Sequence, residues 1–231
     1  MKVQWLSQSL QDVPSGIEWL HPSEQKVLAG FKFPKRRNDW MLGRWTAKNC
    51  VTGLLNSNDS GVPLNEIAVL AADDGAPEVF YKDNAVNCNI SLSHSHGVAI
   101  SAVVPEGTII GCDLEKIEKR SPLFIEDYFT EREKSVILGD TDNQTSLLAN
   151  LMWSAKESVV KALRVGLSVD TKLIEIICTP MGNEGEWHRM DINYPSQQLN
   201  LHGMWQSSSG YVITMVCDQP NFEPIGIQKG V

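Results

Sequence analysis

Gly97-Val-Ala-Ile-Ser-Ala-Val103 resembles Gly210-Tyr-Val-Ile-Thr-Met-Val216, which follows it at an offset of 113 residues. Short β-branched runs recur in many proteins, so one such match alone has little weight. The same offset relates further residue pairs that precede the two runs: Trp40 and Trp153, Lys48 and Lys161, Gly53 and Gly166. Agreement of separate segments in one register predicts an internal duplication, with chance resemblance as the alternative.

Each half is predicted to run from helices into strands. In the first half, Pro22-Ser23-Glu24 indicates the start of a short helix with Ser23 as its N-cap. A longer helix is expected over about 36–55, because apolar residues recur along one stripe. The alternation and β-branching of 98–104 predict a strand.

The second half repeats this order. Thr130-Glu-Arg-Glu133 is a capping-box pattern with Thr130 as N-cap, a helix is expected over 147–163, and 211–217 predicts the closing strand. We therefore expect an α+β protein of two similar subdomains, 1–106 and 107–231, each a small, mainly antiparallel sheet with helices. A pseudo-twofold would relate them and place a ligand site in the cleft between them. Trp40 and Trp153 would then occupy equivalent buried positions.

Composition narrows the class of protein. The chain has 231 residues and a formal net charge of −8, which argues against binding to nucleic acid or to anionic lipid over its whole surface. Its five cysteines are scattered and include no C-x-x-C pair, so neither a disulfide framework nor a zinc site is expected. No apolar run approaches the length of a membrane span. These features predict a soluble, cytoplasmic protein.

Two acidic residues lie on one predicted strand, Thr108-Ile-Ile-Gly-Cys-Asp-Leu-Glu115. Strand side chains alternate between faces, so Asp113 and Glu115 share a face with Gly111, which would leave room there for a bulky ligand. Two acids at this spacing repel each other unless a cation lies between them, and magnesium with phosphate oxygens suits such a pair. A solvated strand end is the alternative, since D-x-E is a common pattern.

A second group of charged residues lies on the predicted helix in Trp153-Ser-Ala-Lys-Glu-Ser-Val-Val-Lys161. Glu157 and Lys161 are one turn apart, and Lys156 flanks them. An ordinary surface ion pair is the more frequent meaning of this spacing, with Trp153 in the core.

The two motifs together resemble the paired signature of 4'-phosphopantetheinyl transferases, G-[IV]-D-[IL]-E followed by W-x-x-K-E-[AS]-x-x-K. Asn89-Ile-Ser-Leu-Ser-His-Ser95 is similar to a further family segment, S-[IL]-S-H-[ST]. Length and duplication resemble the larger, surfactin-type branch, which folds as two pseudo-symmetric halves. One departure is Gly75-Ala-Pro77, where many relatives have lysine in place of alanine, so a contact of those relatives is absent or supplied elsewhere.

The resemblance implies a reaction and a set of roles. The enzyme would transfer the 4'-phosphopantetheine moiety of coenzyme A to a carrier-protein serine and release adenosine 3',5'-bisphosphate. The implied magnesium ligands are Asp113, Glu115 and Glu157, with Glu115 the least secure because some relatives have an apolar residue there. Glu157 would take the serine proton, and Lys161, with Lys156 at its flank, would offset charge on the leaving phosphate.

Basic residues of the first long helix are the expected coenzyme A contacts. Arg37, Arg44 and Lys48 fall on one stripe, and Arg36-Arg-Asn-Asp-Trp-Met-Leu-Gly-Arg44 resembles the coenzyme-A-binding helix of some family members. Arg36 and Arg44 are the candidates for the 3'-phosphate, although a solvated helix face is the simpler interpretation. The family segment adds Ser93 and His94, and Lys156 and Lys161 complete the implied set.

The expected partners are coenzyme A and an apo carrier protein of fatty-acid, polyketide or nonribosomal-peptide synthesis, with the enzyme itself a monomer. Two alternatives stay open: a non-catalytic homologue that binds coenzyme A or a carrier, and a metal-dependent phosphohydrolase. The hydrolase would act on coenzyme A with no carrier present, whereas the transferase requires one.

Overall fold

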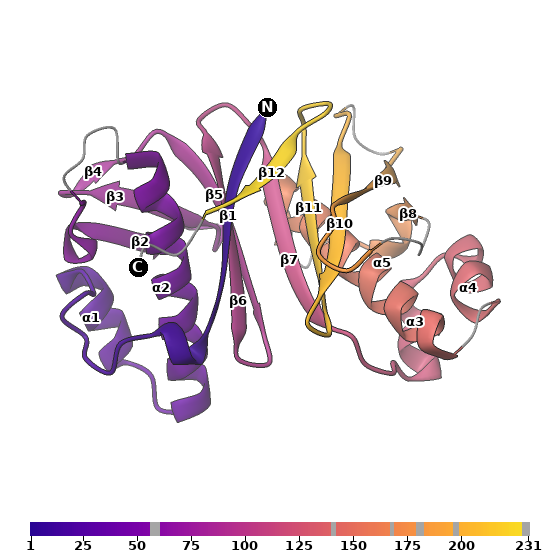
Figure 1. Ribbon diagram of the computed structural model, residues 1–231, viewed down its shortest axis with the longest axis horizontal. Coiled ribbons are helices and arrows are strands. Elements are labelled where there is room, and N and C mark those ends of the chain that lie inside the picture. Colours follow the sequence, from indigo (N-terminus) through magenta and orange to yellow (C-terminus); the bar gives the residue numbers. More distant parts are fainter. Residues whose placement is uncertain (56–60, 140–141, 167–168, 179–182, 196–198, 228–231) are drawn as a thin grey trace. The chain divides into compact units, whose positions relative to one another are not determined.

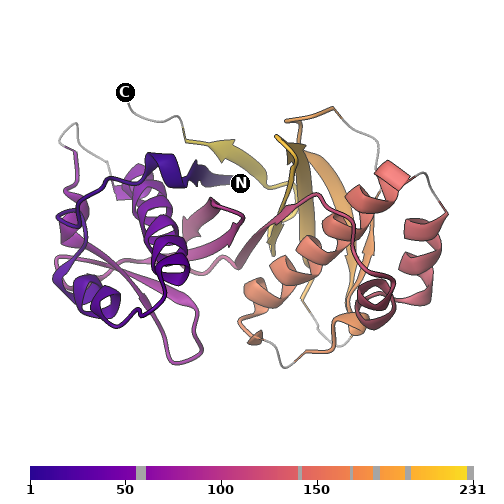
Figure 2. The same ribbon diagram turned by 90° about the horizontal axis from the view of Figure 1, so that it is seen from below.

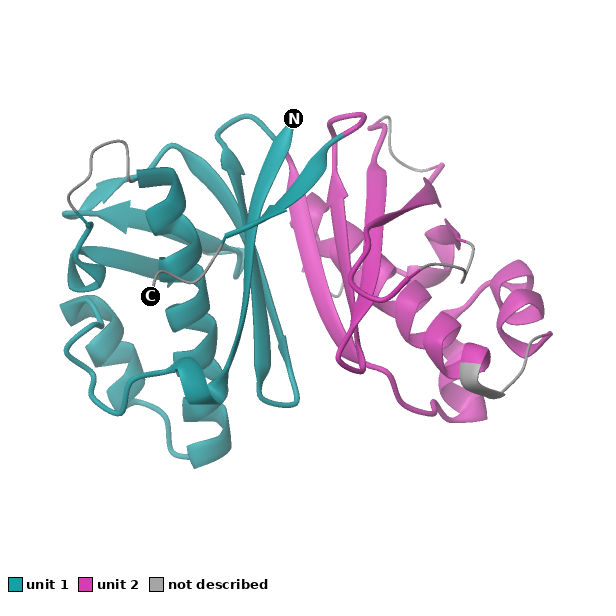
Figure 3. Ribbon diagram, viewed as in Figure 1, with its two compact units in different colours: residues 1–108, 222–231 teal, residues 109–221 magenta. Residues whose placement is uncertain are grey.

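The computed structural model describes the chain apart from residues 56–60, 140–141, 167–168, 179–182, 196–198 and 228–231. It divides into unit 1, residues 1–108 and 222–231, and unit 2, residues 109–221 (Figure 3). The expected first boundary, after residue 106, falls two residues earlier. The C-terminal end was expected in the second subdomain, but strand β12 (Glu223–Gly226) pairs in parallel with β1 (Lys2–Ser9) and so belongs to unit 1.

Unit 1 places one long helix on a small sheet (Figure 1). After β1, its elements are α1 (Pro22–Ala29), α2 (Pro34–Leu55), β2 (Ile67–Ala71), β3 (Pro77–Tyr81), β4 (Asn84–Ala85), β5 (Cys88–Ser95) and β6 (Val98–Pro105). The strands form one sheet in the order β12-β1-β6-β5 and a second in the order β2-β3-β4, with β3 packed beside β5. Helix α2 packs across β1, β6 and β5.

Unit 2 repeats this arrangement with one continuous sheet. Its elements are β7 (Ile110–Lys116), α3 (Pro122–Tyr128), α4 (Glu131–Leu138), α5 (Asp142–Leu163), β8 (Glu175–Ile177), β9 (His188–Asn193), β10 (His202–Ser208) and β11 (Tyr211–Cys217). Neighbouring strands pair antiparallel in the order β7-β11-β10-β9-β8, and α5 runs along one face of this sheet (Figure 2). The expected α+β class, with antiparallel sheets and helices, is confirmed.

The strand pairings confirm the internal duplication. In unit 1, β6 lies between β1 and β5, and in unit 2, β11 lies between β7 and β10. Leu6 pairs with Ser101 across the first of these ladders, and Asp113 pairs with Thr214 across the second. Ser101 and Thr214 are 113 residues apart, so the offset found in the sequence holds for these strands.

The long helices follow a different offset. The thiol of Cys50 on α2 donates to the carbonyl oxygen of Ser101 at 3.4 Å, and the hydroxyl of Ser158 on α5 donates to that of Thr214 at 3.3 Å. Cys50 and Ser158 are 108 residues apart, because unit 2 has five more residues between its long helix and these strands. The expected pairing of Trp40 with Trp153 is therefore wrong.

The counterpart of Trp153 is Trp45. Trp40 is half-buried and packs against Phe31 at 5.6 Å, whereas Trp153 packs against Tyr128 of α3 at 4.7 Å. The two tryptophans that share the 113-residue offset thus lie in unrelated surroundings. Single-residue matches between helices can be displaced by one turn without changing which face is apolar.

A buried ion pair connects the helices and the sheet of unit 2. Glu133 is the third residue of the capping box predicted at Thr130, and its Oε2 accepts from the Thr130 amide at 2.9 Å. The same oxygen lies 2.7 Å from Nζ of Lys156 on α5, while Oε1 accepts from the Ile176 amide of β8 at 2.8 Å. One carboxylate therefore joins α4, α5 and the edge of the sheet.

Unit 1 contains the same ion pair. Glu24 of α1 contacts Nζ of Lys48 on α2 and accepts from the Val69 amide of β2 at 3.0 Å. Glu24 also closes a capping box, but the N-cap is His21 and not the expected Ser23. Neither lysine nor either glutamate is exposed by more than 1%, so both pairs stabilise the interior.

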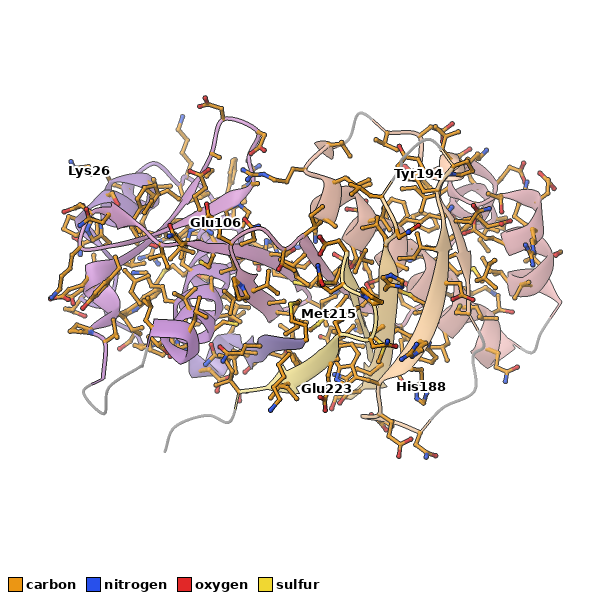
Figure 4. The ribbon with its side chains drawn as sticks, turned by 90° about the horizontal axis from the view of Figure 1, so that it is seen from above. Lys26, Glu106, His188, Tyr194, Met215 and Glu223 are labelled. Atoms are coloured by element: carbon orange, nitrogen blue, oxygen red, sulfur yellow. The ribbon has the colours of Figure 1, made fainter. Side chains whose placement is uncertain are left out.

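The apolar cores lie between each long helix and its sheet. Ala47, Cys50 and Val51 of α2 pack onto the first sheet, and Leu151, Ala155 and Val159 are among the residues of α5 that pack onto the second. Met215 of β11 is buried on the sheet face opposite α5, whereas Lys26 projects from the exposed side of α1 (Figure 4). None of the described helices combines the length and the apolar character needed to cross a membrane.

We predict that Lys156→Ala lowers the free energy of unfolding by about 3–5 kcal/mol, because it leaves the charge of Glu133 buried and uncompensated. The exposed pair of Arg132 and Glu175, 3.4 Å apart, provides the control, and Arg132→Ala should cost less than about 1 kcal/mol. Urea denaturation followed by circular dichroism measures both. Equal, small losses in the two variants would show that the buried pair is dispensable.

Candidate active site

The site of unit 2 lies along the seam between β7 and α5. Gly111 makes the seam narrow: a Cβ atom there would overlap the Ser158 carbonyl and the Ala162 amide of α5. This face of β7 was expected to leave room for a ligand at Gly111, but the room is taken by the helix. Asp113 and Glu115, on the same face, consequently meet side chains of α5.

Asp113 and Lys161 form the centre of this seam. Nζ of Lys161 donates to Oδ1 of Asp113 at 2.7 Å and lies 3.3 Å from the Cys112 carbonyl oxygen. Asp113 is only 3% exposed, whereas Lys161 is half-buried. Burial acts to lower the pKa of Lys161, but the charges of Asp113 and Glu157 outweigh it and raise that pKa overall. Lys161 therefore stays charged at neutral pH.

Glu157 lies one helical turn before Lys161 and is also half-buried. Burial raises the pKa of the Glu157 carboxyl, and the negative charge of Asp113 raises it further, against the opposing charge of Lys161. A carboxylate with a raised pKa at the mouth of a seam is a better proton acceptor than an ordinary glutamate.

Glu115 is held by two donors. Its Oε1 accepts from the indole Nε1 of Trp153 at 3.1 Å, and its Oε2 accepts from Arg120 at 2.9 Å. Burial and the charge of Asp113 raise the pKa of Glu115, while Arg120 and Trp153 oppose that shift. The structure thus brings Asp113, Glu115, Glu157 and Lys161 together, and it adds Trp153 and Arg120 to them.

The carboxylates suit a hard cation only in part. Asp113 and Glu157 offer the oxygen ligands that magnesium prefers, and a cation would relieve the repulsion that raises the pKa of Glu157. Within the described ranges, however, no three His, Cys, Asp or Glu side chains are arranged as a ready metal site. Glu115 accounts for this difference, since Arg120 and Trp153 already occupy its two oxygens.

Lys156, expected to contact coenzyme A and the leaving phosphate, has another role. Its ammonium group is fully buried against Glu133 and donates to the Tyr128 and Thr171 carbonyl oxygens at 3.0 and 2.9 Å. Burial lowers the pKa of Lys156 despite the neighbouring charge of Glu133. Adjacent residues on a helix point about 100° apart, so Lys156 faces the core where Glu157 faces the seam.

The basic residues of α2 differ in their surroundings. Arg36 is exposed, and Arg37 is half-buried. The guanidinium of Arg44 lies over the Trp40 ring at 5.0 Å, and its Nε is buried with no hydrogen bond to the described part of the chain. Burial lowers the pKa of Arg44, and the charge of Glu24 offsets this only partly. A desolvated arginine of this kind favours an anionic ligand.

Ser93 and His94 fall on opposite faces of β5. His94 shares a face with Leu92, whose side chain contacts Gly43 of α2, and it lies at the exposed end of that face. Ser93 is buried on the other face. Strand alternation therefore keeps the two side chains from reaching one phosphate together, and His94 is the one that shares the side of α2.

Sequence reasoning missed Arg120 and Asn150. Arg120 donates from Nε to Oδ1 of Asn150 at 2.7 Å while it contacts Glu115. One signal was present: Asn150, Trp153, Glu157 and Lys161 follow one another at spacings of three or four residues, which predicts a polar stripe on one helix face. The position of Arg120, after the end of β7, carries no comparable signal.

Comparison with known proteins identifies the family. A model described as the 4'-phosphopantetheinyl transferase superfamily matches residues 109–216, which fall within unit 2. A holo-[acyl-carrier-protein] synthase of Streptococcus agalactiae serotype III (strain NEM316) is 31% identical over 86 residues, 36% of this chain and 72% of that protein. The chain belongs to the 4'-phosphopantetheinyl transferase superfamily.

Relatives within this superfamily extend over both units. An L-aminoadipate-semialdehyde dehydrogenase-phosphopantetheinyl transferase of Pongo abelii is 26% identical over 246 residues, 98% of this chain and 75% of that protein. Among solved structures, the holo-(acyl-carrier-protein) synthase of Bacillus anthracis in complex with coenzyme A matches with a TM-score of 0.38 and 22% identity. That match covers 45% of this chain and 94% of the other.

We predict that Glu157→Gln raises the melting temperature at pH 7 in the presence of a chelator. Because the pKa of Glu157 is raised in the folded protein, its ionisation costs stability as the pH rises from the ordinary value of 4.5 through the folded value. The stabilisation should shrink towards zero as the pH falls to about 4.5.

Differential scanning fluorimetry from pH 4 to pH 8 measures this dependence. Glu106→Gln removes the same charge from an exposed turn of unit 1 (Figure 4) and should change the melting temperature little at any pH. A Glu157→Gln variant that melts below wild type at pH 7 would contradict the raised pKa.

Proposed function

We propose that this protein transfers the 4'-phosphopantetheine moiety of coenzyme A to a serine of an apo carrier protein. The observation that carries the proposal is the seam of unit 2, where Lys161 pairs with Asp113 at 2.7 Å beside the half-buried Glu157. Membership of the superfamily, and relatives named for this transfer that match nearly the whole chain, support it.

The reaction is a substitution at phosphorus. The carrier serine oxygen attacks the β-phosphorus of coenzyme A, the new P–O bond forms, and the bond to the bridging pyrophosphate oxygen breaks to release adenosine 3',5'-bisphosphate. Such transfers depend on positioning and charge stabilisation more than on a covalent intermediate. No nucleophile of this chain is therefore required.

Two residues of the seam have direct roles. Glu157 accepts the proton of the serine hydroxyl, directly or through a water, and its raised pKa suits it to this task at neutral pH. Lys161 stays charged and lies at the same place, so it stabilises negative charge on the leaving phosphate. Asp113 holds the ammonium group of Lys161 in position through their ion pair.

Magnesium belongs to this proposal. Asp113 and Glu157 would hold the ion, and Glu115 stands close enough to influence it electrostatically. When bound, magnesium neutralises charge on the pyrophosphate oxygens. Coenzyme A would in addition contact Arg36, Arg37, Arg44 and His94 of unit 1.

Intact mass spectrometry of purified apo carriers, incubated with this protein, magnesium and coenzyme A, tests the function. We predict a phosphopantetheine mass gain with wild type and a rate lowered by at least about a hundredfold in Asp113→Ala, as expected for loss of a metal ligand and of the Lys161 partner. A chelator should abolish the gain. Breakdown of coenzyme A with no carrier present would indicate the phosphohydrolase instead, and binding without turnover would indicate a silent homologue.

The role of Arg44 gives a separate prediction. If Arg44 binds the 3'-phosphate, Arg44→Ala should raise KM more than it lowers kcat, because binding remote from the reacting phosphorus is uniform between ground and transition states. The expected loss is about 1.5–3 kcal/mol in binding, the value of a charge-assisted hydrogen bond. With 3'-dephospho-coenzyme A the loss should largely vanish.

The four values of kcat/KM, for two proteins and two substrates, give the coupling between Arg44 and the 3'-phosphate. Arg36→Ala, measured in the same way, shows whether the exposed arginine contributes as well. A coupling near zero for both variants would remove the basic residues of α2 from the coenzyme A site.

A further inference from the structure

Arg120, in the segment between β7 and α3, is held from three sides. Its Nε donates to Asn150 Oδ1 at 2.7 Å, and an Nη donates to Glu115 Oε2 at 2.9 Å. Its guanidinium also lies over the Phe124 ring at 4.8 Å. With its side chain 19% exposed, Arg120 is a fixed part of the seam and has little freedom to turn towards another ligand.

The partner that fixes Arg120 is itself rigid. Asn150 is fully buried on α5, and its Nδ2 donates to the carbonyl oxygens of Glu118 and Ser146, both at 2.7 Å. With both amide protons engaged, the Oδ1 atom remains as the acceptor that faces Arg120. A buried residue of the helix thereby sets the place of the guanidinium.

Glu115 receives a donor on each of its oxygens. Arg120 contributes a full positive charge to Oε2, and the Trp153 indole contributes a neutral N–H group to Oε1. A carboxylate in a charge-assisted hydrogen bond has little left to offer a cation. Asp113 keeps a second oxygen beyond the one that contacts Lys161, and Glu157 lies beyond the reach of Arg120's printed contacts.

We propose that Arg120 is a positioning residue that keeps Glu115 out of the metal's coordination and offsets its charge. Three carboxylates then face two cations, Lys161 and Arg120, so the seam retains little net charge. The protein alone binds a divalent cation weakly and takes it up together with the pyrophosphate of coenzyme A. This inference rests on the proposed function and specifies the order in which that site fills.

Direct binding of Mn²⁺, measured from the electron paramagnetic resonance signal of the free ion, tests the proposal without turnover. The full chain is titrated with and without coenzyme A, and no carrier is added. Wild type should bind Mn²⁺ weakly alone and more tightly with coenzyme A. Arg120→Gln should bind Mn²⁺ alone about threefold more tightly or better, because one nearby positive charge is gone.

Two variants control for charge. Arg132→Gln removes the same charge from an exposed position of unit 2 and should leave Mn²⁺ binding as in wild type. Arg120→Lys keeps the charge near Glu115 and should also stay close to wild type. An equal effect of Arg120→Gln and Arg132→Gln would overturn the role of Arg120.

The double variant Arg120→Gln/Glu115→Gln decides whether Glu115 is a ligand. It has the net charge of the wild-type seam and lacks only the Glu115 carboxylate, so it remains informative even where Arg120→Gln alone fails to fold. We expect it to bind Mn²⁺ within about twofold of wild type, since a charge-neutral exchange leaves the field nearly unchanged. A loss of about tenfold or more would show that Glu115 coordinates the ion and would overturn the inference.

Failure of the proposed function has a different signature. If no variant binds Mn²⁺ even with coenzyme A, and a chelator leaves modification of the carrier unchanged, the magnesium role itself fails. If Mn²⁺ binds wild type as tightly without coenzyme A as with it, the magnesium role stands and the joint uptake proposed here is overturned.

Discussion

The close approach of α5 to β7 at Gly111 is the constraint on which the candidate site depends. Any side chain at Gly111 would meet the backbone of α5 at Ser158 and Ala162. Because the helix lies this close, Lys161 reaches Asp113 at 2.7 Å and Glu157 comes within electrostatic range of the same carboxylate. Charge repulsion and burial then raise the pKa of Glu157, which gives the seam its capacity to accept a proton.

The same scaffold occurs in unit 1 without these charges. Both units join their helices to the sheet through a buried glutamate–lysine pair and connect the long helix to the central strand through a small polar side chain. By strand and helix register, the counterparts of the site residues are uncharged: Leu6 for Asp113, Gln8 for Glu115, Asn49 for Glu157 and Gly53 for Lys161. The scaffold therefore does not require the acidic site, and the charges of unit 2 serve chemistry rather than folding.

Much of this followed from the sequence. Periodicity placed the long helices and central strands, and the pair Asp113 and Glu157 was predicted from two motifs that the structure brings to one seam. The helical offset was missed because matches at Trp40 and Lys48 imitated the strand offset, although Trp45-Thr-Ala-Lys48 and Trp153-Ser-Ala-Lys156 repeat at 108 residues. Arg120 escaped notice since its contacts come from Asn150, thirty residues away.

The sequence by itself determined the class of fold, the duplication and the identity of the acidic residues, because alternation, capping boxes and short motifs are local properties of the chain. Tertiary structure alone decided which charges meet. Lys156 and Lys161 are equivalent in any local pattern, yet one is buried against Glu133 and the other faces Asp113. The reason is physical: the energy of a charge depends on its burial and on partners distant in sequence, and only packing sets both.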